Sequence, residues 1–247
     1  MKTVATVECR MTSSRLPGKV MLESCGRPML EHLVARLKAV SGIDAIVLAT
    51  TVNAQDDVIE ELAARLGVGC YRGSEDDVLD RVLKAAYSVK AELIVEITGD
   101  CPLVDPELAS QVLKCFLAND CDYVSNDLFP SYPLGMDVQV FTVEALEQAD
   151  REGRTQEDRE HVSWYIVQNP QIFRQIMLPA PQELHWPDLR ITLDEQADYN
   201  LINALIHALG PDGRLFSCHE IVRYLRAHPE LLNVNKGVVQ RIPGQHA

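Results

Sequence analysis

The chain has 247 residues, a length typical of one large domain, with 23 Lys and Arg against 36 Asp and Glu, a formal net charge of −13. This acidity argues against nucleic acid or an anionic membrane surface as a partner. Seven singly spread cysteines, the lack of a signal-peptide pattern and the lack of an apolar run of about 18 residues favour a cytoplasmic protein with reduced thiols and no membrane span.

Strand-like and helix-like segments alternate through the first half of the chain. The β-branched and apolar runs predict buried strands at 4–7, 45–50 and 93–98, and the helical periodicity predicts helices at 29–39, 55–66, 77–89 and 105–117. The last of these helices opens on Asp105-Pro106, a pair suited to a helix start. This order predicts an α/β fold with a mostly parallel sheet and helices on both faces.

The pattern changes after Cys121. Residues 122–143 are rich in Pro, Tyr and Phe and alternate in polarity near their end, which predicts a β-hairpin arm that leaves the sheet. Such an arm has to bury its aromatic side chains, so we expect a homodimer built on it, with an arm folded back on its own domain as the alternative. A strand at 189–193 and helices at 157–168, 198–209 and 218–227 complete a single domain over residues 1–247.

One loop between the first strand and the first helix concentrates positive charge. It contains Arg10, Ser13, Ser14, Arg15, Gly18 and Lys19. Arginine offers forked donors to phosphate oxygens, lysine a point charge, and exposed backbone N–H groups add fixed dipoles. Loops after the first strand of an α/β sheet lie at its carboxyl edge, where ligands bind. The loop therefore predicts a phosphate site, with an ordinary surface loop as the alternative.

Two aspartates follow predicted strands. Asp100 comes after the strand at 93–98, and Asp194 ends the apparent strand at 189–193. Two carboxylates from separate strand ends suit one or two Mg²⁺ ions, for which Mn²⁺ is expected to substitute, because hard ions prefer oxygen ligands. Alternatively, Asp100 merely caps a turn. Asp137 is a further acidic candidate, structural or facing a sugar.

Several blocks of the chain resemble the sugar-activating cytidylyltransferases, the CMP-Kdo and CMP-acylneuraminate synthetases, and most closely the spore coat polysaccharide biosynthesis protein F type. The blocks are Arg10–Lys19, Gly73–Arg81, Thr98–Pro102, Tyr132–Asp137, Arg159–Val162 and Thr192–Glu195, in this order. The resemblance implies a Rossmann-like nucleotidyltransferase fold of the GT-A-like kind, and an arm that dimerises beside the acceptor site.

The resemblance also implies roles for single residues. Asp100 and Asp194 would bind the metal, Arg72, Gly73 and Ser74 would contact the nucleobase, and Arg159 and His161 would face the acceptor together with Asp137. A histidine such as His161 is otherwise typical of a packed or capping side chain. One departure concerns the base: Glu8 stands where that group usually has Gln, and an ionised Glu only accepts hydrogen bonds whereas Gln also donates them.

These features together predict an enzyme. We expect a Mg²⁺-dependent nucleotidyltransferase that moves CMP from CTP to an acidic sugar or related anionic acceptor and releases pyrophosphate. Arg10, Arg15 and Lys19 would hold the triphosphate, and Asp100 would act with them at the reacting centre. The alternatives are a sugar-1-phosphate nucleotidyltransferase, a glycosyltransferase of similar fold, or a catalytically silent nucleotide-binding subunit.

Overall fold

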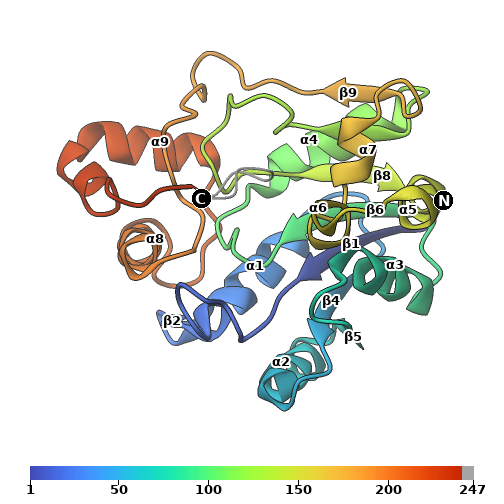
Figure 1. Cartoon of the computed structure of the whole chain (residues 1–247). Helices are drawn as coiled ribbons and strands as arrows, with labels where there is room; N and C mark the ends of the chain where they lie inside the picture. The colour runs from blue at the N-terminus through green and yellow to red at the C-terminus, as the bar shows by residue number, and fades with distance from the viewer. Residues whose placement is uncertain (241–247) are drawn as a thin grey trace.

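A computed structural model describes residues 1–240, so residues 241–247 of the predicted single domain lie outside the described residues. Its centre is a seven-stranded sheet in the order β5-β4-β1-β6-β8-β7-β9 (Figure 1). The strands are β1 (Thr3–Glu8), β4 (Ala45–Thr51), β5 (Gly69–Gly73), β6 (Leu93–Thr98), β7 (Tyr123–Ser125), β8 (Gln139–Thr142) and β9 (Gln175–Met177). The first four are parallel, which confirms the predicted mostly parallel α/β sheet.

Nine α-helices are described around the sheet within residues 1–240. They are α1 (Met29–Leu37), α2 (Asp57–Leu66), α3 (Val78–Ser88), α4 (Pro106–Leu117), α5 (Val143–Glu152), α6 (Gln156–Glu160), α7 (Trp164–Gln168), α8 (Gln196–Leu209) and α9 (Cys218–Ala227). Short 3₁₀ turns, η1 (Lys19–Met21), η2 (Ala54–Asp56) and η3 (Pro229–Asn233), and a small β2 (Glu23–Ser24) and β3 (Arg27–Pro28) hairpin complete the order. No helix of the described chain is long and apolar enough to cross a membrane.

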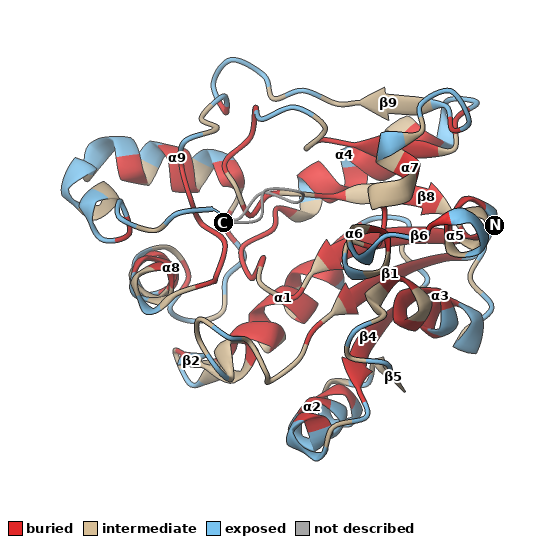
Figure 2. Cartoon of the chain, in the orientation of Figure 1, coloured by how far each residue is buried: buried red, intermediate tan, exposed pale blue. Residues whose placement is uncertain are grey.

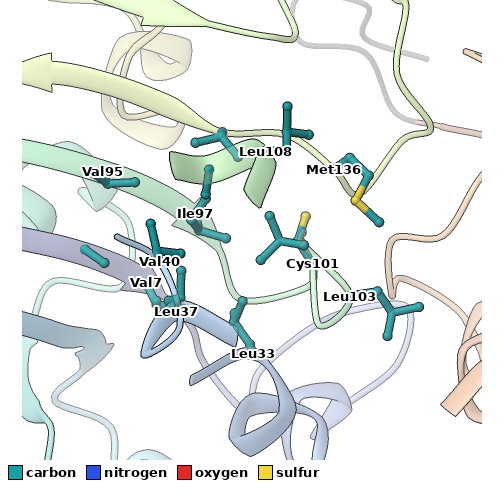
Figure 3. Close-up of a cluster of buried hydrophobic side chains, with 14 of the residues drawn as sticks. Val7, Leu33, Leu37, Val40, Val95, Ile97, Cys101, Leu103, Leu108 and Met136 are labelled. Carbon is teal, nitrogen blue, oxygen red and sulfur yellow. The ribbon is translucent and has the colours of Figure 1, made fainter. Parts of the chain in front are cut away.

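The two faces of the sheet carry separate apolar cores. Alternation along β1 sends Ala5 and Val7 to one face, against α1, α2, α4, α8 and α9, and Val4 to the other, against α3, α5 and α7. Buried residues accordingly concentrate on the strands and on the inner sides of the helices (Figure 2). On the first face, Val95 and Ile97 of β6 pack with Leu33 and Leu37 of α1 (Figure 3). Helices on both faces match the expectation.

The predicted hairpin at 122–143 is present, but it does not leave the sheet. β7 and β8 pair antiparallel with each other, and β8 also pairs antiparallel with β6. Tyr123 and Phe141 are fully buried and stacked, and Tyr132 is also buried. The prediction of a protruding arm was wrong because these aromatic side chains find their core within their own chain. Phe129, 71% exposed in the β7–β8 connection, is the exception.

Two predicted elements of the second half are interrupted. The expected helix at 157–168 divides into α6 and α7, because His161 has an extended backbone between them. The expected strand at 189–193 is an extended segment with one isolated bridge, Leu134↔Arg190. Its backbone pairs with loops, since Leu193 N–H donates to the carbonyl of Asp100 at 2.8 Å. Gly135 permits the close approach of the β7–β8 connection to this segment, because a Cβ there would lie 2.7 Å from the backbone nitrogen of Thr192.

Candidate active site

A cavity of about 830 Å³ opens at the carboxyl ends of β1 and β6. Because these strands are neighbours and parallel, the loops that follow them meet at one edge of the sheet. The β7–β8 connection, α3, α6, the 192–194 segment and Gln240 complete the walls. The predicted site residues among its lining are Arg10, Ser13, Ser14, Arg15, Lys19, Asp100, Asp137, His161 and Asp194.

The loop after β1 places its cations as predicted. It is anchored where Met11 N–H donates to Asp56 Oδ1 at 2.7 Å, and where Gly18 N–H donates to the carbonyl of Met11 at 2.8 Å. Gly18 has a φ of 71°, a left-handed conformation that turns the chain into η1, and it lies behind the lining rather than in it. The turn delivers Lys19 to the cavity.

Lys19 lies between the two predicted metal ligands. Its Nζ is 2.8 Å from Asp100 Oδ2 and 2.9 Å from Asp194 Oδ1, and Arg15 Nη2 is 2.8 Å from the same Asp194 oxygen. Burial alone lowers the pKa of Lys19, but the two carboxylates outweigh it and leave this pKa above its ordinary value. Burial likewise opposes ionisation of Asp194, and Lys19 reverses that effect, so the pKa of Asp194 is lowered.

Arg15 has one hydrogen-bond donor that the described residues leave unsatisfied. Its Nη1 is buried and has no hydrogen-bond partner among the described residues. An unsatisfied buried cationic donor is costly, and an anion in the cavity would satisfy it. Arg10, at the cavity mouth, is 3.1 Å from Glu75 Oε1.

Asp100 and Asp194 fit a hard divalent cation. Their oxygens converge on one ammonium, so a point between them already favours positive charge. No group of three or more Asp, Glu, His or Cys side chains suited to a metal occurs within residues 1–240. Two carboxylates suffice for Mg²⁺, which commonly keeps waters and completes its ligands with substrate phosphates. Mg²⁺ between the two carboxylates would displace the Lys19 ammonium.

Further acidic side chains line the cavity, among them Asp137 and Glu8. Burial raises the pKa of Asp137, the repulsion of Asp127 adds to this, and the pKa reaches about 7. Glu8 lies at the end of β1, and its charge adds to burial in raising the pKa of Glu96 of β6. Oε2 of Glu8 and Oε2 of Glu96 are buried with no hydrogen-bond partner in the described chain.

Besides Gly18, four predicted site residues do not line the cavity. Arg72 is engaged by Asp57 at 2.6 Å and Glu60 at 2.9 Å, outside the lining. Gly73 and Ser74 lie beside it, where Arg81 holds the loop through the carbonyl of Ser74. Their contact with a nucleobase stays a prediction.

Arg159 is the fourth. Its guanidinium binds Asp77 at 2.6 Å and Asp150 at 2.7 Å, and so ties the start of α3 to α5. His161, two residues on, does line the cavity, because the break between α6 and α7 brings it there. Asp77 caps α3 by accepting from Asp80 N–H at 3.0 Å, as the acidic run before that helix predicts.

Some lining residues carried no usable sequence signal. These are Asp127, Gln156 and Gln240. Arg81, at the end of the Gly73–Arg81 block, also lines the cavity, and its Nε donates to the carbonyl of Ala49 at 3.2 Å. Gln240 comes from the far end of the described chain, and nothing in its surroundings in the sequence marks it.

Comparison with known proteins adds four findings. A family model described as cytidylyltransferase matches residues 4–224. The spore coat polysaccharide biosynthesis protein SpsF of Bacillus subtilis is 33% identical over 231 residues, 91% of this chain and 94% of that protein.

Among solved structures, a cytidylyltransferase from Leptospira borgpetersenii is similar at 30% identity with a TM-score of 0.89, over 97% of this chain and 100% of that one. CMP:2-keto-3-deoxy-manno-octonic acid synthetase complexed with CTP has a similar fold, at 17% identity and a TM-score of 0.64, over 84% of this chain and 99% of that one.

Proposed function

Because the chain belongs to the cytidylyltransferase family, we propose that its cavity takes CTP and an acidic sugar or related anionic acceptor and joins CMP to that acceptor. The family match bears out the resemblance and the enzyme class predicted from the sequence blocks. CTP-dependent nucleotidyl transfer follows from the family, and the acceptor and the metal are the proposed parts. The observation that carries them is the convergence of Arg15, Lys19, Asp100 and Asp194 at one point of the cavity.

In the proposed reaction, an oxygen of the acceptor forms a bond to the α-phosphorus of CTP while the bond from that phosphorus to pyrophosphate breaks. Arg10, Arg15 and Lys19 hold the triphosphate and balance the charge that grows on the leaving pyrophosphate. Where the attacking oxygen is a hydroxyl, Asp137 would take its proton, since it lines the cavity and a carboxylate with a pKa of about 7 suits a base at neutral pH. No covalent intermediate with the enzyme is needed.

Asp100 and Asp194 would hold Mg²⁺ in this scheme. The ion would supply charge neutralisation at the phosphate oxygens. The ammonium of Lys19 would then contact the triphosphate in place of the two carboxylates. An anion at Arg15 Nη1 would satisfy the one buried guanidinium nitrogen that lacks a partner there in the described structure.

The decisive experiment measures pyrophosphate release with each of four nucleoside triphosphates and a set of acceptors. We expect turnover with CTP and a sugar acid, such as Kdo or a nonulosonate, or a phosphorylated or phosphonate acceptor. Turnover only with another nucleotide and a sugar 1-phosphate would replace the proposal by the sugar-1-phosphate alternative. Nucleotide binding without any pyrophosphate would indicate a silent subunit.

Removal of divalent metal is expected to abolish turnover, and added Mg²⁺ or Mn²⁺ to restore it. Asp100→Asn and Asp194→Asn should each lower turnover about 100-fold at a metal concentration that saturates the unmodified chain, because each removes a charged oxygen ligand. Asp76→Asn, an exposed aspartate outside the cavity lining, is the matched control. Full turnover of either site variant would exclude that aspartate as a ligand.

A homodimer stays a prediction, and Phe129 is now the aromatic side chain of the hairpin that supports it. The aromatic side chains of the hairpin are buried within the chain, apart from Phe129, which lies beside exposed Pro130. We expect light scattering at high micromolar concentration to give twice the chain mass, and Phe129→Ser to shift the equilibrium toward single chains. A single-chain mass with normal turnover would contradict the dimer.

A further inference from the structure

Asp194 is held from behind by buried polar contacts. Nη2 of Arg190 donates to Asp194 Oδ2 at 2.6 Å, which leaves Oδ1 to Lys19 and Arg15 on the cavity side. Arg190 also pairs with Asp198 through Nε at 2.9 Å, and Asp198 is completely buried. The orientation of the Asp194 carboxylate is therefore set by the Arg190–Asp198 pair.

Asp198 also fixes the backbone of Asp194. Its Oδ2 accepts from the N–H groups of Asp194 and Glu195, both at 3.0 Å, at the start of α8. A carboxylate at this end of a helix is favoured by the helix dipole and satisfies otherwise unpaired N–H groups. Backbone and side chain of Asp194 thus depend on the same buried carboxylate.

The network extends to the C-terminal segment, defined here as residues 234–240. After η3 the chain runs back toward the middle of the molecule (Figure 1). Asn235 is buried, and its Nδ2 donates to the carbonyl of Arg190 at 3.0 Å and to Asp198 Oδ1 at 2.9 Å. Oε1 of Gln240 accepts from Nη1 of Arg190, and Gln240 lines the cavity. Both residues lie beyond the part of the chain that the family model matches.

We propose that Asn235 and Gln240 are positioning residues for Asp194, so that these two residues of the C-terminal segment take part in the active site. This proposal rests on the function proposed above, in which Asp194 serves the reacting centre. The guanidinium of Arg190 is a rigid planar fork. With Nε and Nη2 on carboxylates and Nη1 on Gln240, its plane is fixed at all three nitrogens. Nη2 also contacts Asp198 Oδ2 at 3.2 Å, so Nη1 is the nitrogen that neither carboxylate holds. Loss of Gln240 would leave Nη1 without this contact and loosen the fork that orients the carboxylate of Asp194.

The test compares Gln240→Ala with Val239→Ala, a substitution of the neighbouring, 78% exposed residue, in the full chain. We expect Gln240→Ala to lower kcat about tenfold, with the KM for CTP changed less than twofold, and to weaken Mn²⁺ binding in the presence of CTP by a similar factor, measured by electron paramagnetic resonance. Val239→Ala should change neither quantity. Gln240→Glu should restore both, because a carboxylate also accepts from Nη1 of Arg190.

A second comparison uses Asp194→Asn as the background. If Gln240 acts through Asp194, Gln240→Ala should not weaken Mn²⁺ binding further in that variant. Unchanged kcat and Mn²⁺ affinity in Gln240→Ala, or an undiminished effect in the Asp194→Asn background, would overturn the proposal. A wild-type chain that transfers no CMP would defeat the proposed function instead, while its Mn²⁺ titrations would still decide the role of the segment.

Discussion

Replacing Lys19 by alanine is expected to lower the rate of CMP transfer at least tenfold while the chain stays folded. A charge-assisted hydrogen bond to phosphate contributes about 1.5–3 kcal/mol, and more where it strengthens in the transition state. Arg15→Ala should act in the same direction, since both cations contact Asp194 from the cavity side. Rates of pyrophosphate release and melting temperatures of the purified variants measure the two effects separately.

The fold should tolerate the loss of Lys19 because other cations remain. Asp194 still contacts Arg15 and Arg190 in that variant, so its carboxylate does not become an unpaired buried charge. Lys84→Ala is the matched control: Lys84 also contacts an aspartate, Asp80 at 2.8 Å, but on the exposed surface of α3. Wild-type rates in a normally folded Lys19→Ala variant would exclude the loop after β1 as the triphosphate site.

Substituting Glu8 by glutamine is expected to stabilise the protein at alkaline pH. Burial raises the pKa of Glu8 from 4.5 to about 7, although contact with Glu96 and the charge of Arg81 act against it. Burial and the charge of Glu8 also raise the pKa of Glu96. Asp100 and Asp127, the other acids that act on this pair, repel its ionised form. Two adjacent buried carboxyls retain a proton more readily than either would alone.

The sign of the effect follows from proton linkage. Because the pKa of Glu8 is higher in the folded chain than in the unfolded one, its protonated form contributes stability that is complete below pH 4.5. That stability is lost as the pH rises through about 7. Glutamine keeps the hydrogen-bonding shape without the charge, so Glu8→Gln should melt about 5 °C above wild type at pH 8. The difference should shrink toward pH 4.5.

Thermal unfolding across this pH range gives the measurement. Glu61→Gln, which removes the charge of an exposed glutamate on α2, should leave the dependence of the melting temperature on pH unchanged. If the difference in melting temperature between Glu8→Gln and wild type were the same at every pH, Glu8 would be ionised in the folded chain. The same variant also tests whether residue 8 affects the choice of nucleobase, because glutamine both donates and accepts hydrogen bonds whereas an ionised glutamate only accepts them.

The first half of the fold follows from the sequence alone. The apolar runs at 4–7, 45–50 and 93–98 become β1, β4 and β6, because each is too hydrophobic to lie anywhere but the middle of a covered sheet. Parallel strands bring the segments after their carboxyl ends together at one edge. That rule places Lys19 beside Asp100, 81 positions away, before any side-chain contact is known.

The second half follows from the sequence less well. Alternation and aromatic content at 122–143 predict a hairpin but do not tell which surface buries it, and the structure buries Tyr123 and Phe141 in the chain's own core. Helical periodicity at 157–168 does not show the break at His161. Long-range packing decided both. Pro130, Pro133 and Gly135 mark the connection of the hairpin but not the surface that buries its strands, and no Gly or Pro lies at the break near His161.

The sequence by itself determined the strands β1, β4 and β6, the cationic loop and the two aspartates, because hydrophobic period and charge are local properties of the chain. Only the tertiary structure decided which cations face the cavity. Arg15 and Lys19 do, whereas Arg72 and Arg159 are engaged by carboxylates elsewhere. It also decided that Asn235 and Gln240 reach Arg190 behind Asp194. A charged side chain forms an ion pair with an opposite charge that lies within about 4 Å of it in the folded chain. Residues far apart in the sequence supply these opposite charges.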